Sequence, residues 1–185
     1  GTIIDTKQIN NYPDIREKLH VAIGKNTSSM FDEHHRVISG NATDQALMKF
    51  LGEDSYLKMK EDPSLEIFAS QKFNSSNKFS QAQIGGLTYY KGAPERILQK
   101  ADRYMGTDGQ LHPLDLSCIN QRIDTLAKKA MRVIAFGYSE EPLQENCISG
   151  NLVLIGLAAI RDDVRPEARI AIHDVQKAGI QVVMI

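Results

Sequence analysis

The chain lacks most features that would assign it at once to a specialised class of protein. Its 185 residues include only two cysteines, Cys118 and Cys147, which form no Cys-x-x-Cys pair; we therefore expect neither a disulfide framework nor a zinc knuckle. The 22 Lys and Arg residues face 23 Asp and Glu residues. This near balance argues against a dedicated nucleic-acid-binding protein, which needs a basic surplus for phosphate contacts.

Long apolar runs are also missing. The longest apolar stretch, residues 152–160, ends at Arg161, whereas a membrane-spanning helix needs about 20 apolar residues. The first residues do not show the basic and then apolar pattern of a secretory signal. Hydrophobic residues make up 42% of the chain, a value typical of globular proteins. The composition predicts a soluble, globular piece from a reducing compartment.

Familiar catalytic signatures are absent as well. The sequence contains no Gly-x-x-x-x-Gly-Lys-Ser/Thr phosphate loop, no Gly-x-Ser-x-Gly elbow and no His-Glu-x-x-His pair. Asp32, Glu33, His34 and His35 are consecutive, so their side chains should diverge from a loop and not converge on a metal ion. We therefore assign no catalytic residue and no metal ligand.

Hydrophobic periodicity predicts an α+β fold in most of the chain. Helices are expected from Pro13 to Gly24, from Asn41 or Thr43 as cap to Gly52, from Pro94 through residue 101, and over residues 115–130. Strands are expected over residues 65–68, 79–84, 87–91 and 132–138, with a Gly-Gly hairpin at 85–86. Without regular strand–helix alternation, these elements predict an antiparallel sheet flanked by helices.

The last part of the chain has a different pattern. An apolar strand over residues 152–160, a helix from Pro166 to before Gly179 and an apolar strand over residues 180–185 would form a βαβ unit. A parallel sheet of so few strands cannot be covered on both faces. We therefore expect this unit to be part of a larger domain.

Five segments, taken together, carry a family resemblance. They are residues 40–47 (Gly-Asn-Ala-Thr-Asp-Gln-Ala-Leu), 73–78 (Phe followed by Lys at the sixth position), 91–95 (Lys-Gly-Ala-Pro-Glu), 131–135 (Met-Arg-Val-Ile-Ala) and 162–166 (Asp-Asp-Val-Arg-Pro). Each resembles, in the same order, a signature of the P-type cation-transporting ATPases, and the chain is most similar to their calcium-transporting branch. The match extends from Gly40 to the last residue.

The resemblance implies a division of the chain and a role for it. Residues 1–160 would be the nucleotide-binding domain, and residues 161–185 the hinge and first part of a haloacid-dehalogenase-like phosphorylation domain. The intact enzyme would use ATP to move a cation, expected to be Ca²⁺, across a membrane. This chain would be a cytoplasmic portion of that integral membrane protein, monomeric and inactive alone. Its partners would be ATP and the phosphorylation, actuator and transmembrane domains of the same polypeptide, with no nucleic acid.

The resemblance also implies a nucleotide site. Phe73 would stack on the adenine ring, for which an aromatic face is suited, and Asp44 would accept a hydrogen bond from the adenine amino group. Cationic side chains would hold the phosphates, and Gly92 would allow close approach of the ligand. The predicted site consists of Asp44, Phe73, Lys78, Lys91, Gly92, Arg132, Asp162 and Arg165.

Each of these side chains also has an ordinary structural interpretation. Phe73 is more often a core residue when it ends an apolar strand, and Asp44 is equally typical of a helix first turn, where a carboxylate is stabilised by the helix dipole. Asp162 suits a helix cap. The cations suit a solvated surface; they are Lys78, Lys91, Arg132 and Arg165.

The sequence departs from the family pattern in four respects. Asp44 stands where the family often has Glu, Ser75 where it often has Arg, and Asp163 where the hinge usually has Pro. The phosphorylated Asp-Lys-Thr-Gly-Thr motif is absent from these residues. The nucleophile and the Mg²⁺ ligands of the family's reaction would therefore lie outside this chain.

Two other functions stay open. One is a fragment of a haloacid-dehalogenase-type phosphatase, although that chemistry needs an Asp-x-Asp motif that the sequence lacks. The other is an interaction module that binds no nucleotide. Hydrolysis of phosphate esters would favour the first, and absence of any response to ATP would favour the second.

Overall fold

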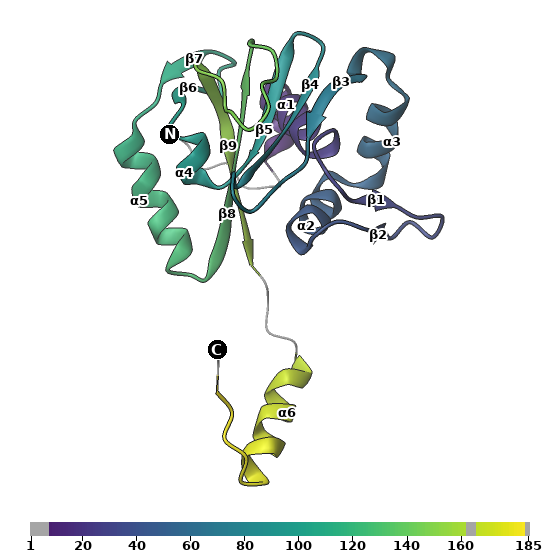
Figure 1. Cartoon of the computed structure of the whole chain (residues 1–185), viewed down its shortest axis with the longest axis vertical. Coiled ribbons are helices and arrows are strands. Elements are labelled where there is room, and N and C mark those ends of the chain that lie inside the picture. The colour runs from purple at the N-terminus through teal and green to yellow at the C-terminus, as the bar shows by residue number, and fades with distance from the viewer. Residues whose placement is uncertain (1–7, 162–165, 184–185) are drawn as a thin grey trace.

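A mixed β-sheet between two groups of helices forms the body of the protein (Figure 1). The computed structural model describes residues 8–161 and 166–183. One face of the sheet is covered by α1 (Pro13–Gly24), α2 (Ala42–Leu51) and α3 (Glu53–Glu61), and the other by α4 (Pro94–Ile97) and α5 (Leu116–Ala127). The predicted α+β class is therefore confirmed.

The sheet has seven strands among the described residues, in the order β3-β4-β5-β8-β9-β6-β7. Adjacent strands are antiparallel except β6 and β9, which pair in parallel, so the prediction of a purely antiparallel sheet was wrong at this position. The last strand of the body is inserted between two earlier ones, which accounts for the parallel pair. The strands are β3 (Ile67–Gln71), β4 (Phe79–Ile84), β5 (Leu87–Gly92), β6 (Ala101–Met105), β7 (Leu111–Pro113), β8 (Met131–Ser139) and β9 (Leu152–Arg161).

Two hydrophobic cores lie on opposite faces of the sheet, because successive side chains of a strand alternate between faces. Tyr89 packs with α1 and α2, while its neighbour Tyr90 packs with α4. In β9 the alternation changes phase: Val153 and Ile155 face the same core as Ala158 and Ile160. The pairing register with β8 shifts at the same place. A β-bulge therefore lies in this pair of strands, and residues 152–155 are apolar at every position because successive side chains enter opposite cores.

Most predicted elements and their capping residues are confirmed. The Asn41 side chain caps α2 by accepting a hydrogen bond from the backbone N–H of Asp44 at 2.9 Å. Gly52 ends that helix with a φ of 79°, a conformation in which glycine avoids steric strain. Asp115, predicted as the first residue of a helix, instead caps α5. The Gly-Gly hairpin joins β4 to β5 as predicted.

Other predictions were wrong or incomplete. The helix that begins at Pro94 ends at Ile97, and Ala101 begins β6. Helical spacing over so few residues cannot be distinguished from a turn followed by a strand. Helix α3 was not predicted, because its sequence is mostly charged and has no fully buried residue. Short elements in predicted loops are η1 (Ile9–Asn11), β1 (Met30–Phe31), β2 (Val37–Ile38) and η2 (Pro63–Leu65).

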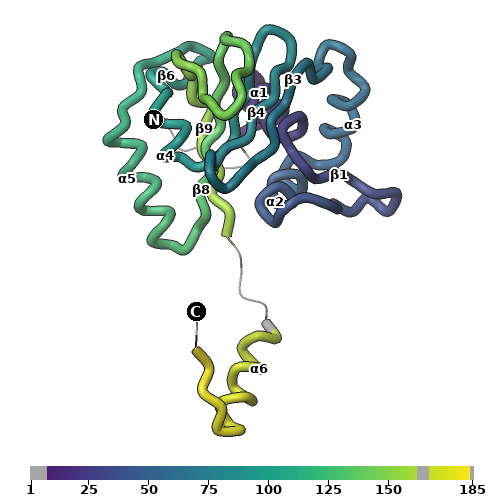
Figure 2. The backbone as a smooth tube through the Cα atoms, in the orientation of Figure 1, coloured from purple at the N-terminus to yellow at the C-terminus, as the bar shows by residue number. Residues whose placement is uncertain are grey.

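The predicted βαβ unit does not form among the described residues. Strand β9 pairs with β8 and β6 in the body, and residues 180–183 form no strand; residues 184–185 lie outside the described part. The predicted helix is present as α6 (Pro166–Lys177) and lies beyond the end of the sheet where β9 ends (Figure 2). In the described ranges, no helix is both long and apolar enough to cross a membrane.

Candidate functional site

A buried ion pair lies where α2 begins and β5 ends. The Lys91 ammonium is 2.6 Å from Oδ1 of Asp44, and each residue is only 6% exposed. Asp44 occupies the first turn of α2, where the helix dipole favours a carboxylate. Asp44 is therefore not simply a carboxylate at the start of a helix, and Lys91 is not a solvated surface lysine, because the two are paired and buried. The pair brings together two of the residues that the sequence singled out.

The surroundings of this pair supply further hydrogen bonds. Lys91 Nζ donates to the backbone carbonyl oxygen of Asn26, and the backbone N–H of Ser28 donates to Asp44 Oδ2 at 3.0 Å. Burial lowers the pKa of Lys91, and the charge and hydrogen bond of Asp44 oppose this shift only in part. Two of the three N–H donors of the ammonium therefore have protein acceptors, and the third can serve a ligand.

Arg132 lies beside this ion pair on β8. Its Nη1 donates to the hydroxyl of Thr43 at 2.9 Å, and Thr43 directly precedes Asp44. The Arg132 side chain is exposed, and a guanidinium has five N–H donors in a planar arrangement suited to phosphate oxygens. Arg132 is thus fixed by one hydrogen bond and retains donors for an anion.

Lys78 lies on the solvent side of the same end of the sheet. Its ammonium is 3.1 Å from Oε1 of Glu95, and both side chains are more than half exposed. The pKa of the Glu95 carboxyl is lowered by a hydrogen bond from its own backbone N–H. The hydrogen bond and the charge of the Lys78 ammonium lower it further. An exposed pair of this kind adds little stability, so Lys78 can exchange Glu95 for another anion at small cost.

Gly92 lies where a neighbouring backbone segment approaches closely. A Cβ atom at this position would lie 2.5 Å from the Lys78 carbonyl oxygen and 2.7 Å from Cα of Phe79. Both are backbone atoms of the neighbouring segment of the same chain, and Phe79 on β4 lies directly opposite Gly92 on β5. Gly92 therefore permits close packing of the protein's own backbone, and that it also admits a ligand stays a prediction.

Phe73 lies in the connection between β3 and β4. Its side chain is 52% exposed, which excludes the core position considered for it. A hydrogen-bond network fixes the connection: Oδ1 of Asn146 accepts from the side-chain amides of Gln71 at 2.9 Å and Asn77 at 2.5 Å. Phe73 lies between these two anchored positions and presents an aromatic ring to solvent.

The register places these groups at one end of the sheet. Strand β4 begins, β5 ends, β8 begins and β9 ends there, and Figure 1 shows α6 beyond the same end. Lys91, Asp44 and Arg132 are connected through contacts with one another or with adjacent residues. Lys78 joins them through its backbone, whose carbonyl accepts from Ala93 N–H at 2.9 Å. The predicted residues Asp162 and Arg165 lie outside the described residues.

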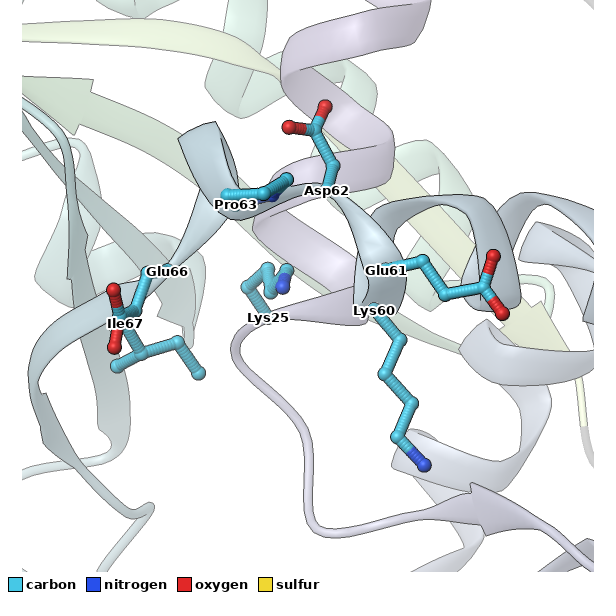
Figure 3. Close-up of a pocket in the computed structure, with 7 residues that line it drawn as sticks. All are labelled: Lys25, Lys60, Glu61, Asp62, Pro63, Glu66 and Ile67. Atoms are coloured by element: carbon cyan, nitrogen blue, oxygen red, sulfur yellow. The ribbon is translucent and has the colours of Figure 1, made fainter.

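A hollow of about 380 Å³ is found elsewhere, between the end of α3 and the start of β3 (Figure 3). Figure 3 shows that the side chains of Lys60 and Glu61 point away from Lys25 and do not converge on one point. A ligand site usually combines an apolar wall with convergent polar groups, so this hollow is a weaker candidate. It is lined by Lys25, Lys60, Glu61, Asp62, Pro63, Glu66 and Ile67.

Several residues of the site could not be identified from the sequence. Asn26 and Ser28 contact the ion pair through backbone atoms, and such contacts have no residue-type signature. Thr43 was considered only as a helix cap, and Asn146 lies in a polar loop far along the chain. Their roles follow from tertiary contacts across 16 to 89 residues of sequence. No periodic pattern in one sequence can reveal such pairings.

Comparison with known proteins identifies the family of this chain. Residues 15–167 match the family model described as "P-type ATPase, cytoplasmic domain N". Because the match covers most of the chain, the protein belongs to this family. The predicted resemblance to P-type cation-transporting ATPases is therefore confirmed.

Two of the individual relatives are named as calcium-transporting ATPases, in agreement with the predicted branch. The chain is 28% identical over 187 residues to Calcium-transporting ATPase 1 of Saccharomyces cerevisiae, covering 93% of this chain and 19% of the relative. It is 30% identical over 165 residues to the plasma membrane-type Calcium-transporting ATPase 7 of Oryza sativa, covering 80% and 16%. A shorter match, 38% over 100 residues, is to Probable cation-transporting ATPase F of Mycobacterium tuberculosis, covering 51% and 11%. The chain thus spans about a fifth or less of the length of these relatives.

Proposed function

We propose that this chain is the ATP-binding domain of a cation-transporting P-type ATPase, and that ATP binds at the end of the sheet described above. The observation that carries the proposal is the buried Asp44–Lys91 pair, with Arg132 and Lys78 beside it. A buried ion pair is a weak source of stability, since desolvation offsets much of the attraction. Perturbed, buried ionisable groups are instead typical of functional sites.

The geometry supports a separate role for each part of the site. The exposed ring of Phe73 offers a face for adenine, and Lys91 has one N–H donor left for a ligand acceptor. Both oxygens of Asp44 already accept hydrogen bonds from the protein, so its first role is to hold Lys91, and contact with the adenine amino group would use a remaining lone pair. Arg132 and Lys78 would attract the phosphates.

The relatives' names support a function for the whole protein, which belongs to the same proposal. ATP would donate its γ-phosphate to an aspartate outside this chain, with Mg²⁺ held there, and the cation moved across the membrane would be Ca²⁺. Residues 161–185 would be the hinge and the start of the phosphorylation domain, with Asp162 and Arg165 approaching the nucleotide. The position of α6 beyond the site end of the sheet supports this assignment (Figure 1).

An amide NMR titration of this chain with ATP, with and without Mg²⁺, tests the proposal. We expect weak binding, with a Kd on the order of 0.1–1 mM, because the phosphates lack the partner domain. Shifts should cluster at Asp44, Phe73, Lys78, Lys91 and Arg132. Absence of shifts at millimolar ATP would contradict the proposal and favour an interaction module. Mg²⁺-dependent hydrolysis of generic phosphate esters would favour a phosphatase.

Matched variants locate the site. Phe73→Ala should weaken ATP binding by about 5- to 150-fold, the equivalent of one base–aromatic stack, and so give smaller shifts at the same ATP concentration. Phe68→Ala is its control, because Phe68 is an 82% exposed ring on β3. Arg132→Gln should weaken binding while Arg103→Gln, on β6, should not. Equal effects of site and control variants would place ATP elsewhere.

A further inference from the structure

The segment between α1 and β1 forms one wall of the Asp44–Lys91 site. At its centre Asn26 is only 6% exposed, although it stands in a polar stretch of sequence. Its side-chain amide donates to the backbone carbonyl of Ser80 at 3.1 Å. Ser80 lies on β4 directly opposite Lys91 on β5. One buried hydrogen bond therefore fixes this segment to the strand adjacent to Lys91.

The same segment contacts both members of the ion pair. The Asn26 backbone carbonyl accepts from Lys91 Nζ, and two residues later the Ser28 N–H donates to Asp44 Oδ2. The segment thus provides an acceptor for the cation and a donor for the anion. A buried ion pair needs such additional hydrogen bonds, because the attraction between its two charges alone does not compensate for the hydration that both have lost.

We propose that Asn26 is a positioning residue of the nucleotide site: its side chain holds the segment that orients Lys91 and, through Ser28, Asp44. The proposal rests on the function proposed above. Asn26 would not contact the nucleotide, since its side chain is engaged by β4 and its carbonyl by Lys91. It would act by fixing the direction of the remaining Lys91 N–H donor.

The test compares Asn26→Ala with Thr88→Val in the full chain. Thr88 is a matched control, because it is fully buried on β5 and also donates a side-chain hydrogen bond to a backbone carbonyl, that of Glu141, at 2.8 Å. It lies three residues before Lys91, away from the pair. Both substitutions remove one buried hydrogen bond and should lower the Tm. If Asn26→Ala does not fold, Asn26→Ser serves in its place.

Two readouts separate positioning from a general structural role. Without nucleotide, the side-chain ¹⁵Nζ NMR signal of Lys91 should shift or broaden in Asn26→Ala and stay unchanged in Thr88→Val. ATP affinity should fall about 3- to 10-fold in Asn26→Ala, as for loss of one hydrogen bond, and stay unchanged in Thr88→Val. If the two variants behave alike in both readouts, Asn26 only supports the fold and the proposal is overturned. If the unsubstituted chain binds no ATP, the proposed function fails, and the Lys91 signal alone then decides whether Asn26 positions the pair.

Discussion

At the scale of single residues, the ion pair changes what a substitution of Lys91 should do. Lys91→Met would leave the Asp44 carboxylate buried without its cation, and breaking such a pair typically costs about 3–5 kcal/mol in the free energy of unfolding. Urea denaturation measures this loss. A Lys91 substitution is also expected to weaken ATP binding, so this loss of stability must be measured together with the affinity.

Two further variants check the cause of that loss. Lys78→Met removes a cation from the exposed pair with Glu95 and should cost less than about 1 kcal/mol. Lys91→Met combined with Asp44→Leu should recover much of the loss, because an apolar pair needs no compensation for buried charge. A cost for Lys91→Met no larger than that for Lys78→Met would show that the buried pair is not formed in solution.

Gly92 permits a second prediction at this scale. In Gly92→Ala the new methyl group would collide with backbone atoms of residues 78 and 79, which cannot rotate away as a flexible side chain can. We expect a loss of about 1–3 kcal/mol, the usual cost of overpacking. Gly86→Ala is the control, since an added Cβ there would meet open space in the described structure. Urea unfolding curves that coincide for the two variants would refute the close approach.

At the scale of elements, the connection between β3 and β4 depends on a residue distant in sequence. Asn146 has a φ of 60°, which glycine also adopts without strain. Asn146→Gly therefore removes the side chain that anchors Gln71 and Asn77 while keeping the backbone conformation. Amide hydrogen exchange over residues 72–78 should become about fivefold faster, the equivalent of about 1 kcal/mol.

Another asparagine provides the control for this experiment. Asn151 also has a positive φ, 54°, and lies outside the network. Asn151→Gly should leave exchange over residues 72–78 unchanged. If both variants accelerate exchange equally, the effect comes from the flexibility of glycine and not from the lost anchor.

The elements also show which features the sequence predicts reliably. Asn41, Gly52 and the Gly-Gly hairpin were predicted because capping and tight turns require particular residues at particular positions. Helix α3 and strand β6 were missed because neither has a period long enough to identify it. The motifs likewise predicted Lys91, Asp44, Arg132 and Lys78 as neighbours. That Asp44 and Lys91 are paired and buried could not be predicted, since it depends on how α2 packs against β5.

At the scale of the whole molecule, α6 lies apart from the sheet (Figure 1). The segment exposes apolar side chains, namely Ile170, Ile172, Val175, Ile180, Val182 and Val183. A chain ending at Arg161 should therefore unfold in urea with a free energy within about 1 kcal/mol of the longer chain. It should also bind less of the dye ANS, which reports exposed apolar surface. A large loss of stability would show that α6 packs on the body.

A shorter chain gives the opposite expectation. Ending the chain at Gly150 removes β9, which lies between β8 and β6 and contributes Leu152 and Val153 to the two cores. We expect this chain not to fold, which circular dichroism would show. The contrast between the two end points would place the boundary of the folding unit near residue 161, close to the boundary predicted at residue 160.

The central place of β9 also has a consequence for the synthesis of the protein. Domains generally fold as units while the ribosome extends the chain, but this sheet closes only with its last strand in sequence. Until residues 152–161 have left the exit tunnel, β8 has an unpaired edge and the β6–β7 hairpin has no partner in the sheet. Unpaired strand edges promote association between chains. The nascent protein therefore passes through a stage that chaperones would be expected to recognise. This stage ends when β9 emerges and pairs with β8 and β6.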